Sequence, residues 1–246
     1  MNYAYTLFGS KNTFSDWGLI LKTQSVGMAT PEASLDALEI YGQAADQKDV
    51  RYKRRAMTFE YETFSPSQFP AIFDEIAAYL HGRKMAIVRS VEPDFTYFGR
   101  CRVDPFKSNR GSGTIVITVD AEPFKLGSYV TETFSNVTGK TITVETAEIT
   151  PAVVKVTPIQ TMASLTITGL SRDKIKWTAE TIVINDLTAN TPVILDGEKD
   201  LYTEGSANKY PDLAIWNPPT VINGNNIIGL SSQYVSVEVK YRPRYM

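Results

Sequence analysis

Histidine and cysteine are almost absent from this sequence: His81 and Cys101 are the only residues of either type among 246. A single cysteine permits neither an intrachain disulfide nor a cysteine-based metal cluster. A catalytic histidine would need a nucleophile and an orienting carboxylate, and no serine lies in a Gly-x-Ser-x-Gly context. We therefore interpret His81 as a structural or solvated residue at a helix end and Cys101 as a small buried hydrophobe.

Long apolar runs and a strong charge excess are missing too. No apolar run approaches the ~18 residues that a membrane helix needs, and the N-terminus shows no signal-peptide pattern. Residues 1–125 contain 15 basic and 15 acidic side chains, and residues 126–246 contain 10 and 12, for a net charge of −2. Neither half has the composition of a nucleic-acid module. With no phosphate loop, zinc motif or paired-carboxylate motif visible, we expect no enzyme, no cofactor, no metal and no membrane partner.

Strict alternation of apolar and polar residues dominates what is present. In "RAMTFEYE", Met57, Phe59 and Tyr61 share one side, which is the period-2 pattern of a half-buried strand. "KMAIVRSV" and "TYFGRCRV" are predicted to be the next strands, separated by the turn-forming "EPD" at 92–94. Similar short segments fill the second half at intervals of ten or so residues. This spacing is typical of sandwiches and barrels and predicts a mainly all-β protein.

One segment departs from that pattern and predicts a single amphipathic helix near 66–81. Its apolar residues are spaced as one helical stripe: Phe69, Ile72, Phe73, Ile76 and Leu80. Gly82 suits the C-terminal stop. A composition change after "DAEPFKLG" places a boundary at about residue 127. We therefore expect two domains, 1–127 with the helix and 128–246.

Two loops could be ligand sites or turns. "LDGEKDLYTEG" concentrates Asp196, Glu198, Asp200 and Glu204, oxygens that calcium could use. It lacks the spacing of a calcium loop, and its Asp-Gly is a hairpin signal, so we favour a turn. "NPPTVINGNNII", residues 217–228, combines two prolines with an Asn-Gly that favours a tight reversal. We interpret it as turn chemistry as well.

Basic and aromatic residues supply the remaining candidates. "KDVRYKRR" at 48–55 could bind phosphate, but no recognition helix or stacking motif accompanies it, so a solvated strand start or a protein interface is favoured. Within it, Arg55 is in phase with the apolar face and Arg54 points the other way. Trp177 and Trp216 could stack on a sugar ring, or could fill core and interface. A galectin-type sugar site needs a histidine, and the second half has none.

Several stretches, in order along nearly the whole chain, resemble the distal tail (Dit) proteins of long-tailed bacteriophages. The stretches that carry the resemblance are "FGSKNTFSDWGLIL", "RYKRRAMTFEYE", "EPDFTYFGRCRVD", "VDAEPFKLG", the segment from "VILDGEKD" through "NPPTVINGNNII", and "VSVEVKYRPRYM".

This resemblance implies an N-terminal β domain that assembles into a ring, hexameric in the family, and a C-terminal galectin-like β-sandwich that serves for docking. It implies a structural protein at the virion tail tip, made in the host cytoplasm, that joins the tail tube protein to the tail hub or tail-associated protein and to receptor-binding proteins. We add the hypothesis that Arg55, Tyr61, Phe98, Arg100 and Arg102 make contacts between ring subunits.

An adhesin remains the alternative function. In it, the second domain is a carbohydrate-binding β-sandwich that contacts the host cell surface through Trp177 and Trp216. A wall-degrading enzyme is disfavoured by the missing catalytic constellations.

Overall fold

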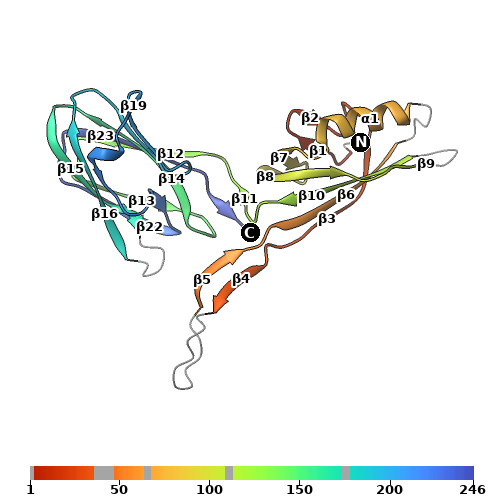
Figure 1. Cartoon of the computed structure of the whole chain (residues 1–246), viewed down its shortest axis with the longest axis horizontal. Helices are drawn as coiled ribbons and strands as arrows, with labels where there is room; N and C mark the ends of the chain where they lie inside the picture. Colours follow the sequence, from red (N-terminus) through yellow and green to blue (C-terminus); the bar gives the residue numbers. More distant parts are fainter. Residues whose placement is uncertain (1–2, 36–46, 64–67, 109–112, 173–177) are drawn as a thin grey trace, which may run out of the picture. The chain divides into compact units, whose positions relative to one another are not determined.

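The computed structural model describes residues 3–35, 47–63, 68–108, 113–172 and 178–246. The chain forms two compact units, Met1–Leu126 and Gly127–Tyr245, which Figure 1 shows in colours that follow the sequence. Each unit has its own hydrophobic core. The prediction of a mainly β protein with one helix is confirmed among the described residues. The observed division lies one residue from the expected boundary at 127.

The N-terminal unit is built on one antiparallel sheet with the strand order β2-β1-β7-β8-β10-β6-β3. Two short strands pair at its margin, β9 with β10 and β11 with β8. A separate hairpin joins β4 to β5. The bounds of these strands are β1 Thr6–Phe8, β2 Lys11–Asn12, β3 Ile20–Val26, β4 Pro31–Leu35, β5 Gln47–Tyr52, β6 Arg55–Thr63, β7 Lys84–Arg89, β8 Glu92–Val103, β9 Lys107–Ser108, β10 Gly113–Ala121 and β11 Lys125–Leu126.

Strict alternation gives this sheet one buried and one polar face. Strand β6 alternates between buried residues and exposed or half-buried ones along its whole length, and β10 pairs with it in an unbroken register of nine residue pairs. Because successive side chains of a strand point to opposite faces, the apolar set lies on one side. We call that side the core face and the other the outer face. The predicted strand at 55–62 is confirmed by this pattern.

The helix α1, Phe69–Leu80, packs on the core face. Phe69, Ile76 and Leu80 are buried there, so the predicted apolar stripe is confirmed. The helix ends at His81, and Gly82 follows with φ +77°, the left-handed conformation that glycine adopts without strain. The first two residues of the expected range, 66 and 67, lie outside the described residues.

The turn between β7 and β8 corrects one sequence expectation. "EPD" was expected to separate the two strands, but β8 begins at Glu92 and contains all three residues. Arg89 pairs with Glu92 across the hairpin, which leaves Ser90 and Val91 as the turn. An ion pair of 2.9 Å between Arg89 and Glu92 holds the strand ends together at this point.

The C-terminal unit consists of two antiparallel sheets that share one apolar core. One sheet has the order β12-β23-β14-β17-β18-β19 with β21 beside β14, and the other has the order β13-β22-β15-β16-β20. The bounds are β12 Val130–Ser135, β13 Gly139–Val144, β14 Thr150–Pro158, β15 Met162–Arg172, β16 Ala179–Leu187, β17 Val193–Asp196, β18 Leu201–Glu204, β19 Ala207–Asn208, η1 Tyr210–Asp212, β20 Leu213–Ala214, β21 Thr220–Val221, β22 Gly224–Leu230, β23 Val235–Tyr241 and β24 Arg244–Tyr245.

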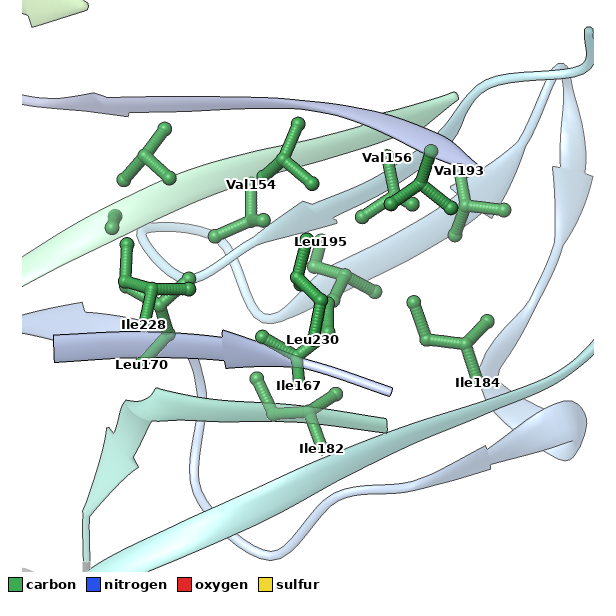
Figure 2. Packing of buried hydrophobic residues seen from close by; sticks show 14 of the residues in the cluster. Val154, Val156, Ile167, Leu170, Ile182, Ile184, Val193, Leu195, Ile228 and Leu230 are labelled. Carbon is green, nitrogen blue, oxygen red and sulfur yellow. The ribbon is translucent and has the colours of Figure 1, made fainter. Parts of the chain in front are cut away.

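Branched aliphatic side chains from both sheets fill the space between them, as Figure 2 shows. Val154 and Leu195 come from one sheet, and Ile167, Ile182 and Ile228 from the other; all five are fully buried. This packing of two sheets face to face defines a β-sandwich. The prediction of a sandwich in the second half therefore describes the observed layers, and its galectin-like character stays a prediction.

Candidate interaction surfaces

Arg100 and Arg102 lie on the outer face of the N-terminal sheet. Both belong to β8, and they alternate with Cys101 and Val103, which are buried on the core face. The Arg102 guanidinium pairs with Asp104 at 3.1 Å, while its side chain stays 67% exposed. Arg100 donates a hydrogen bond to the carbonyl of Gly82 and is exposed. These two predicted interface residues therefore present charge to solvent in the single chain.

Strand β6, two positions away in the sheet order, gives the same outer face the opposite sign. Glu60 and Glu62 alternate with the buried Phe59 and Tyr61, so they project on the side of Arg100 and Arg102. Strand β10 lies between the two sets of charges. The outer face thus carries carboxylates along β6, where Glu60 pairs with Lys22 at 3.4 Å, and guanidinium groups along β8.

Arg55 and Tyr61, also predicted to contact a neighbouring subunit, lie inside their own unit. Arg55 is only 4% exposed and donates hydrogen bonds to the carbonyl of Pro123, with its guanidinium 5.6 Å from the centre of the Tyr97 ring. Burial lowers the pKa of Arg55, while Tyr97 and Glu92 oppose that shift. Tyr61 is fully buried, and burial raises the pKa of its hydroxyl. Both side chains serve the core, and they offer no surface to a partner in this conformation.

The alternation predicted for the basic segment "KDVRYKRR" holds where the structure describes side chains. Arg55 points to the core face, and Arg54 points away from it and pairs with Asp120 at 3.1 Å. Phe98, the last predicted interface residue, is half-buried on the outer face of β8. The interface hypothesis is therefore carried forward with Phe98, Arg100 and Arg102.

A network of polar side chains lies where β8 begins, next to the buried core residue Tyr97. The Glu92 carboxylate accepts hydrogen bonds from Arg89 (2.9 Å), from the Tyr97 hydroxyl (2.9 Å) and from Lys125 (3.0 Å). Burial alone would raise the pKa of Glu92, but the hydrogen bonds from Lys125 and Tyr97 and the two positive charges outweigh it and leave the pKa lowered. Sequence reasoning missed this network, because its members come from three separate strands.

His81 and Cys101 have structural surroundings. The Nδ1 atom of His81 accepts a hydrogen bond from the backbone N–H of Val103 at 3.2 Å, which ties the helix end to β8. His81 also lines a groove of about 700 Å³ beside Phe73, Arg102 and Phe106. Cys101 is buried, and burial raises the pKa of its thiol to about 12, so a thiolate is disfavoured at neutral pH. The interpretation of Cys101 as a buried hydrophobe is confirmed.

The acidic segment at 195–205 is a hairpin, with its turn at 197–200 between β17 and β18. The Asp196 side chain accepts hydrogen bonds from the backbone N–H groups of Glu198 (3.0 Å) and Lys199 (3.1 Å), a local arrangement that aspartate favours in turns. Asp200 and Gly205 both have positive φ, +53° and +58°. In the part of the chain that the structure describes, no group of three or more metal-binding side chains gathers. The turn interpretation is confirmed.

The "NPPTVINGNNII" stretch is turn chemistry with a buried amide at its centre. Asn226 is fully buried; its Oδ1 accepts from the N–H of Ile222 at 2.9 Å, and its Nδ2 donates to the carbonyls of Ile222 (2.9 Å) and Gly224 (3.2 Å). Gly224 has φ +86°, as a tight reversal requires. Strand β22 already begins at Gly224. On the sequence alone, Ile227 and Ile228 are the residues expected to begin this strand, so the expected start lies three residues after the observed one.

The two tryptophans proposed for sugar stacking have different outcomes. Trp177 lies outside the described residues. Trp216 is 86% exposed and follows the edge strand β20. Beside it, the Asn217 amide donates to Glu180 at 2.9 Å, and the Ser171 hydroxyl donates to the carbonyl of Asn217 at 2.8 Å. The exposure of Trp216 sets it apart from Trp17, which is buried in the other unit.

No family model matches this sequence, and none of the curated proteins compared with it matches either. Among solved structures, the chain is similar to the crystal structure of the Dit protein of phage SPP1, described as a paradigm of the hub adsorption apparatus in phages that infect Gram-positive bacteria. The TM-score is 0.75 at 11% sequence identity, and the match covers 100% of both chains.

Two structures of the phage P2 baseplate in its activated conformation, with calcium and with strontium, are more distant. Their TM-scores are 0.45 and 0.44 at 10% identity, and the matches cover 98% and 97% of this chain and 98% of theirs. The likeness to SPP1 Dit shows a shared fold over the full length, which confirms the resemblance found in the sequence at the level of the fold. No helix among the described residues is long and apolar enough to cross a membrane.

Proposed function

We propose that this chain is a structural component of a phage tail tip. In this proposal it forms a ring, hexameric by analogy, at the distal end of the tail tube and joins the tube to the baseplate hub and to receptor-binding proteins. It acts in the virion and catalyses no reaction. The observation that carries the proposal is the likeness to SPP1 Dit, which spans both units from end to end. A likeness confined to one sandwich would carry far less, because sandwiches host many functions.

The outer face of the N-terminal sheet is the surface we assign to the ring. A ring of identical subunits closes by rotation through a heterologous interface, in which two different patches of one chain meet. Arg100 and Arg102 supply one patch, and Glu60 and Glu62 supply a second patch of opposite sign. Strand β3, which ends the sheet order, adds backbone groups that a neighbour can pair with.

Light scattering and negative-stain microscopy of the purified full-length chain test the ring. The expected result is a closed oligomer whose mass is a small multiple of the 27.4 kDa subunit. Because some rings need their partners in order to close, the measurement is repeated with the tail tube and hub proteins of the same phage. A strict monomer under both conditions contradicts the proposal.

Charge reversal tests whether the assigned residues form the ring interface, independently of whether the chain forms a ring at all. The double variant Arg100→Glu and Arg102→Glu is expected to abolish the oligomer without changing the far-UV circular dichroism spectrum, because both side chains project from the fold. Lys140→Glu, an exposed lysine on β13, is the matched control. If the double variant assembles like the control, the ring stands and the assigned interface is wrong.

A carbohydrate-binding adhesin is the second candidate, and one observation favours it. Trp216 is exposed, and the Glu180 and Asn217 side chains beside it could bond to sugar hydroxyls. Glycan-array binding that disappears in Trp216→Ala would support this function. Uniformly absent binding across the array would exclude it.

A further inference from the structure

The lateral edge of the C-terminal unit, residues 207–217, joins the two sheets of the sandwich. Strand β19 is the last strand of one sheet and β20 the last strand of the other, with η1 between them. In its sheet, β20 has β16 on one side, through the pairs Val183–Ala214 and Ile184–Leu213. Its other side is the end of the sheet order. A sheet end of this kind presents backbone donors and acceptors that an extended segment can pair with.

Two large aromatic side chains stand exposed on this edge. Tyr210, which precedes β20 in the sequence, is 58% exposed, and Trp216, which follows it, is 86% exposed. Trp and Tyr are the residue types enriched at the energetic centres of protein interfaces, because they bury a large area at little cost in conformational entropy. A tryptophan left almost wholly in water is therefore the kind of side chain that a partner covers.

The charge around this edge is strongly negative. Residues 180–212 contain seven acidic side chains and two lysines, whereas the rest of the unit, 127–179 and 213–245, contains five acidic and eight basic ones. The acidic excess therefore belongs to the segment that runs from β16 through β19 and η1.

Contacts around Lys209, the residue before Tyr210, bring acidic groups together. Lys209 is buried between Glu204 (2.8 Å) and Asp212 (3.0 Å), and its ammonium donates to the carbonyl of Asp186 at 2.8 Å. The two carboxylates paired with Lys209 outnumber its single positive charge, and Asp186, whose backbone carbonyl it contacts, is itself exposed.

The aromatic rings belong to the same arrangement. The Tyr210 ring stacks on Tyr202, with centroids 5.8 Å apart, and the Tyr202 hydroxyl donates to Asp200 at 2.5 Å. At the other end of the edge, Glu180 lies beside Asn217, the neighbour of Trp216. Carboxylates therefore lie near both ends of the segment, Asp212 two residues after Tyr210 and Glu180 bonded to the neighbour of Trp216.

We propose that the lateral edge of the C-terminal unit binds a basic, extended segment of a partner protein. The segment adds a strand to β20, and its Lys or Arg side chains lie over Trp216 and Tyr210 and against the neighbouring carboxylates. A cation over the face of an aromatic ring is attracted by it, most strongly over tryptophan. The inference names the chemistry of one partner of the proposed hub and in that respect rests on the proposed function.

The test measures binding of labelled peptides to the full-length chain by fluorescence anisotropy. Three peptides of equal length alternate Thr with Lys, with Gln or with Glu, so that they share strand propensity and differ in charge. We expect the Lys peptide to bind and the other two not to bind. Binding should weaken as salt rises, because the pairing charges are exposed to solvent.

Variants locate the binding site. Trp216→Ala should weaken Lys-peptide binding at least about tenfold, as expected for a central interface tryptophan. Asp186→Asn removes one carboxylate at a position with φ +52°, which asparagine adopts readily, and should weaken binding severalfold. Tyr234→Ala, an exposed aromatic elsewhere in the unit, is the matched control and should bind like the unchanged protein. Circular dichroism confirms that each variant is folded.

Defined outcomes overturn the inference. These are failure of the Lys peptide to bind, equal binding of all three peptides, or binding that Trp216→Ala leaves unchanged. Glycan binding that depends on Trp216 would reassign the edge to sugar, and self-association that depends on Trp216 would reassign it to a second copy of this chain. If the chain, including Trp216→Ala, forms the ring but no peptide binds, the proposed function is kept and the peptide-binding edge is rejected. If no ring forms but the Lys peptide binds at Trp216, the peptide-binding edge is kept and the ring is rejected.

Discussion

Replacing Glu92 with glutamine should destabilise the N-terminal unit and change how its stability depends on pH. The Glu92 carboxylate accepts hydrogen bonds from two cations, Arg89 and Lys125, and from Tyr97. A third cation, Arg55, lies over the Tyr97 ring. Within these described contacts, three positive charges share one negative charge. The substitution keeps the side chain's size and removes the negative charge.

The cost follows from how little water reaches the two cations that would lose their partner. The Arg89 and Lys125 side chains are 14% and 17% exposed. Breaking an ion pair by removing one member of a deeply buried pair costs about 3–5 kcal/mol, and hydrogen bonds to charged groups contribute about 1.5–3 kcal/mol each. Because the glutamine oxygen still accepts one hydrogen bond and some water reaches the site, we expect a loss of about 2–3 kcal/mol in the free energy of unfolding at neutral pH.

The pH dependence has a definite sign. The pKa of Glu92 is lower in the folded protein than the usual value of about 4.3 for the unfolded chain. A lowered folded-state pKa stabilises the fold above the unfolded pKa, and this stabilisation is lost as pH falls through the folded pKa. The difference in stability between the unchanged protein and Glu92→Gln should therefore be full near neutral pH and shrink in the acid range below the unfolded pKa.

Urea unfolding at neutral and acid pH measures this, with Trp17 emission as the probe because that side chain is buried in the N-terminal unit. The other two tryptophans, Trp177 and Trp216, are replaced by Phe in every variant. Glu62→Gln, on the outer face of β6, is the matched control and should change stability by less than about 0.5 kcal/mol. A Glu92→Gln effect as small as the control's, or one that grows as pH falls, would refute the reasoning.

Three further outcomes are expected. Gly169→Ala should destabilise the C-terminal unit by at least about 2 kcal/mol in thermal unfolding, because φ is +83° and a Cβ would lie 2.0 Å from the carbonyl oxygen of Ile227; an unchanged melting temperature would contradict this. Cys101 should resist a thiol reagent in the native protein and react in denaturant, and rapid native labelling would contradict its burial. Asn226→Ala should cost about 1–3 kcal/mol by leaving the N–H of Ile222 without its partner, and a neutral result would contradict the assigned hydrogen bonds.

The sequence predicts well those features that depend on neighbouring residues. Alternation along β6 places Arg55 on the apolar face and Arg54 on the other, because the side-chain period of a strand is two. The stripe from Phe69 to Leu80 predicts the helix for the same kind of reason, with a period of 3.6. The turn after β7 was misplaced, because proline and aspartate favour turns in general, whereas here the pair between Arg89 and Glu92 closes the hairpin before them.

Features that depend on distant pairing were not predictable. The Glu92 network joins side chains more than 30 residues apart, since Lys125 reaches it from β11. The burial of Arg55 could be predicted from its position in the alternating pattern of β6. Its hydrogen-bond partner, the Pro123 carbonyl, could not, because it lies 68 residues away. An aromatic residue is as a rule placed in the core, so only the structure reveals that Trp216 is exposed.

This chain shares its fold with SPP1 Dit over the full length at only 11% sequence identity, so the fold constrains few of the individual residues. A sandwich or a helix-covered sheet needs apolar residues at the right period and turns at the right places, and many sequences satisfy those conditions. Nothing in that requirement determines which side chains stand on the outside. The partners of this chain must therefore be established from its own exposed residues, with Arg100 and Arg102 testing the ring and Trp216 testing the lateral edge. Because the ring is assigned to one unit and the edge to the other, a single set of variants can lose either property and keep the other.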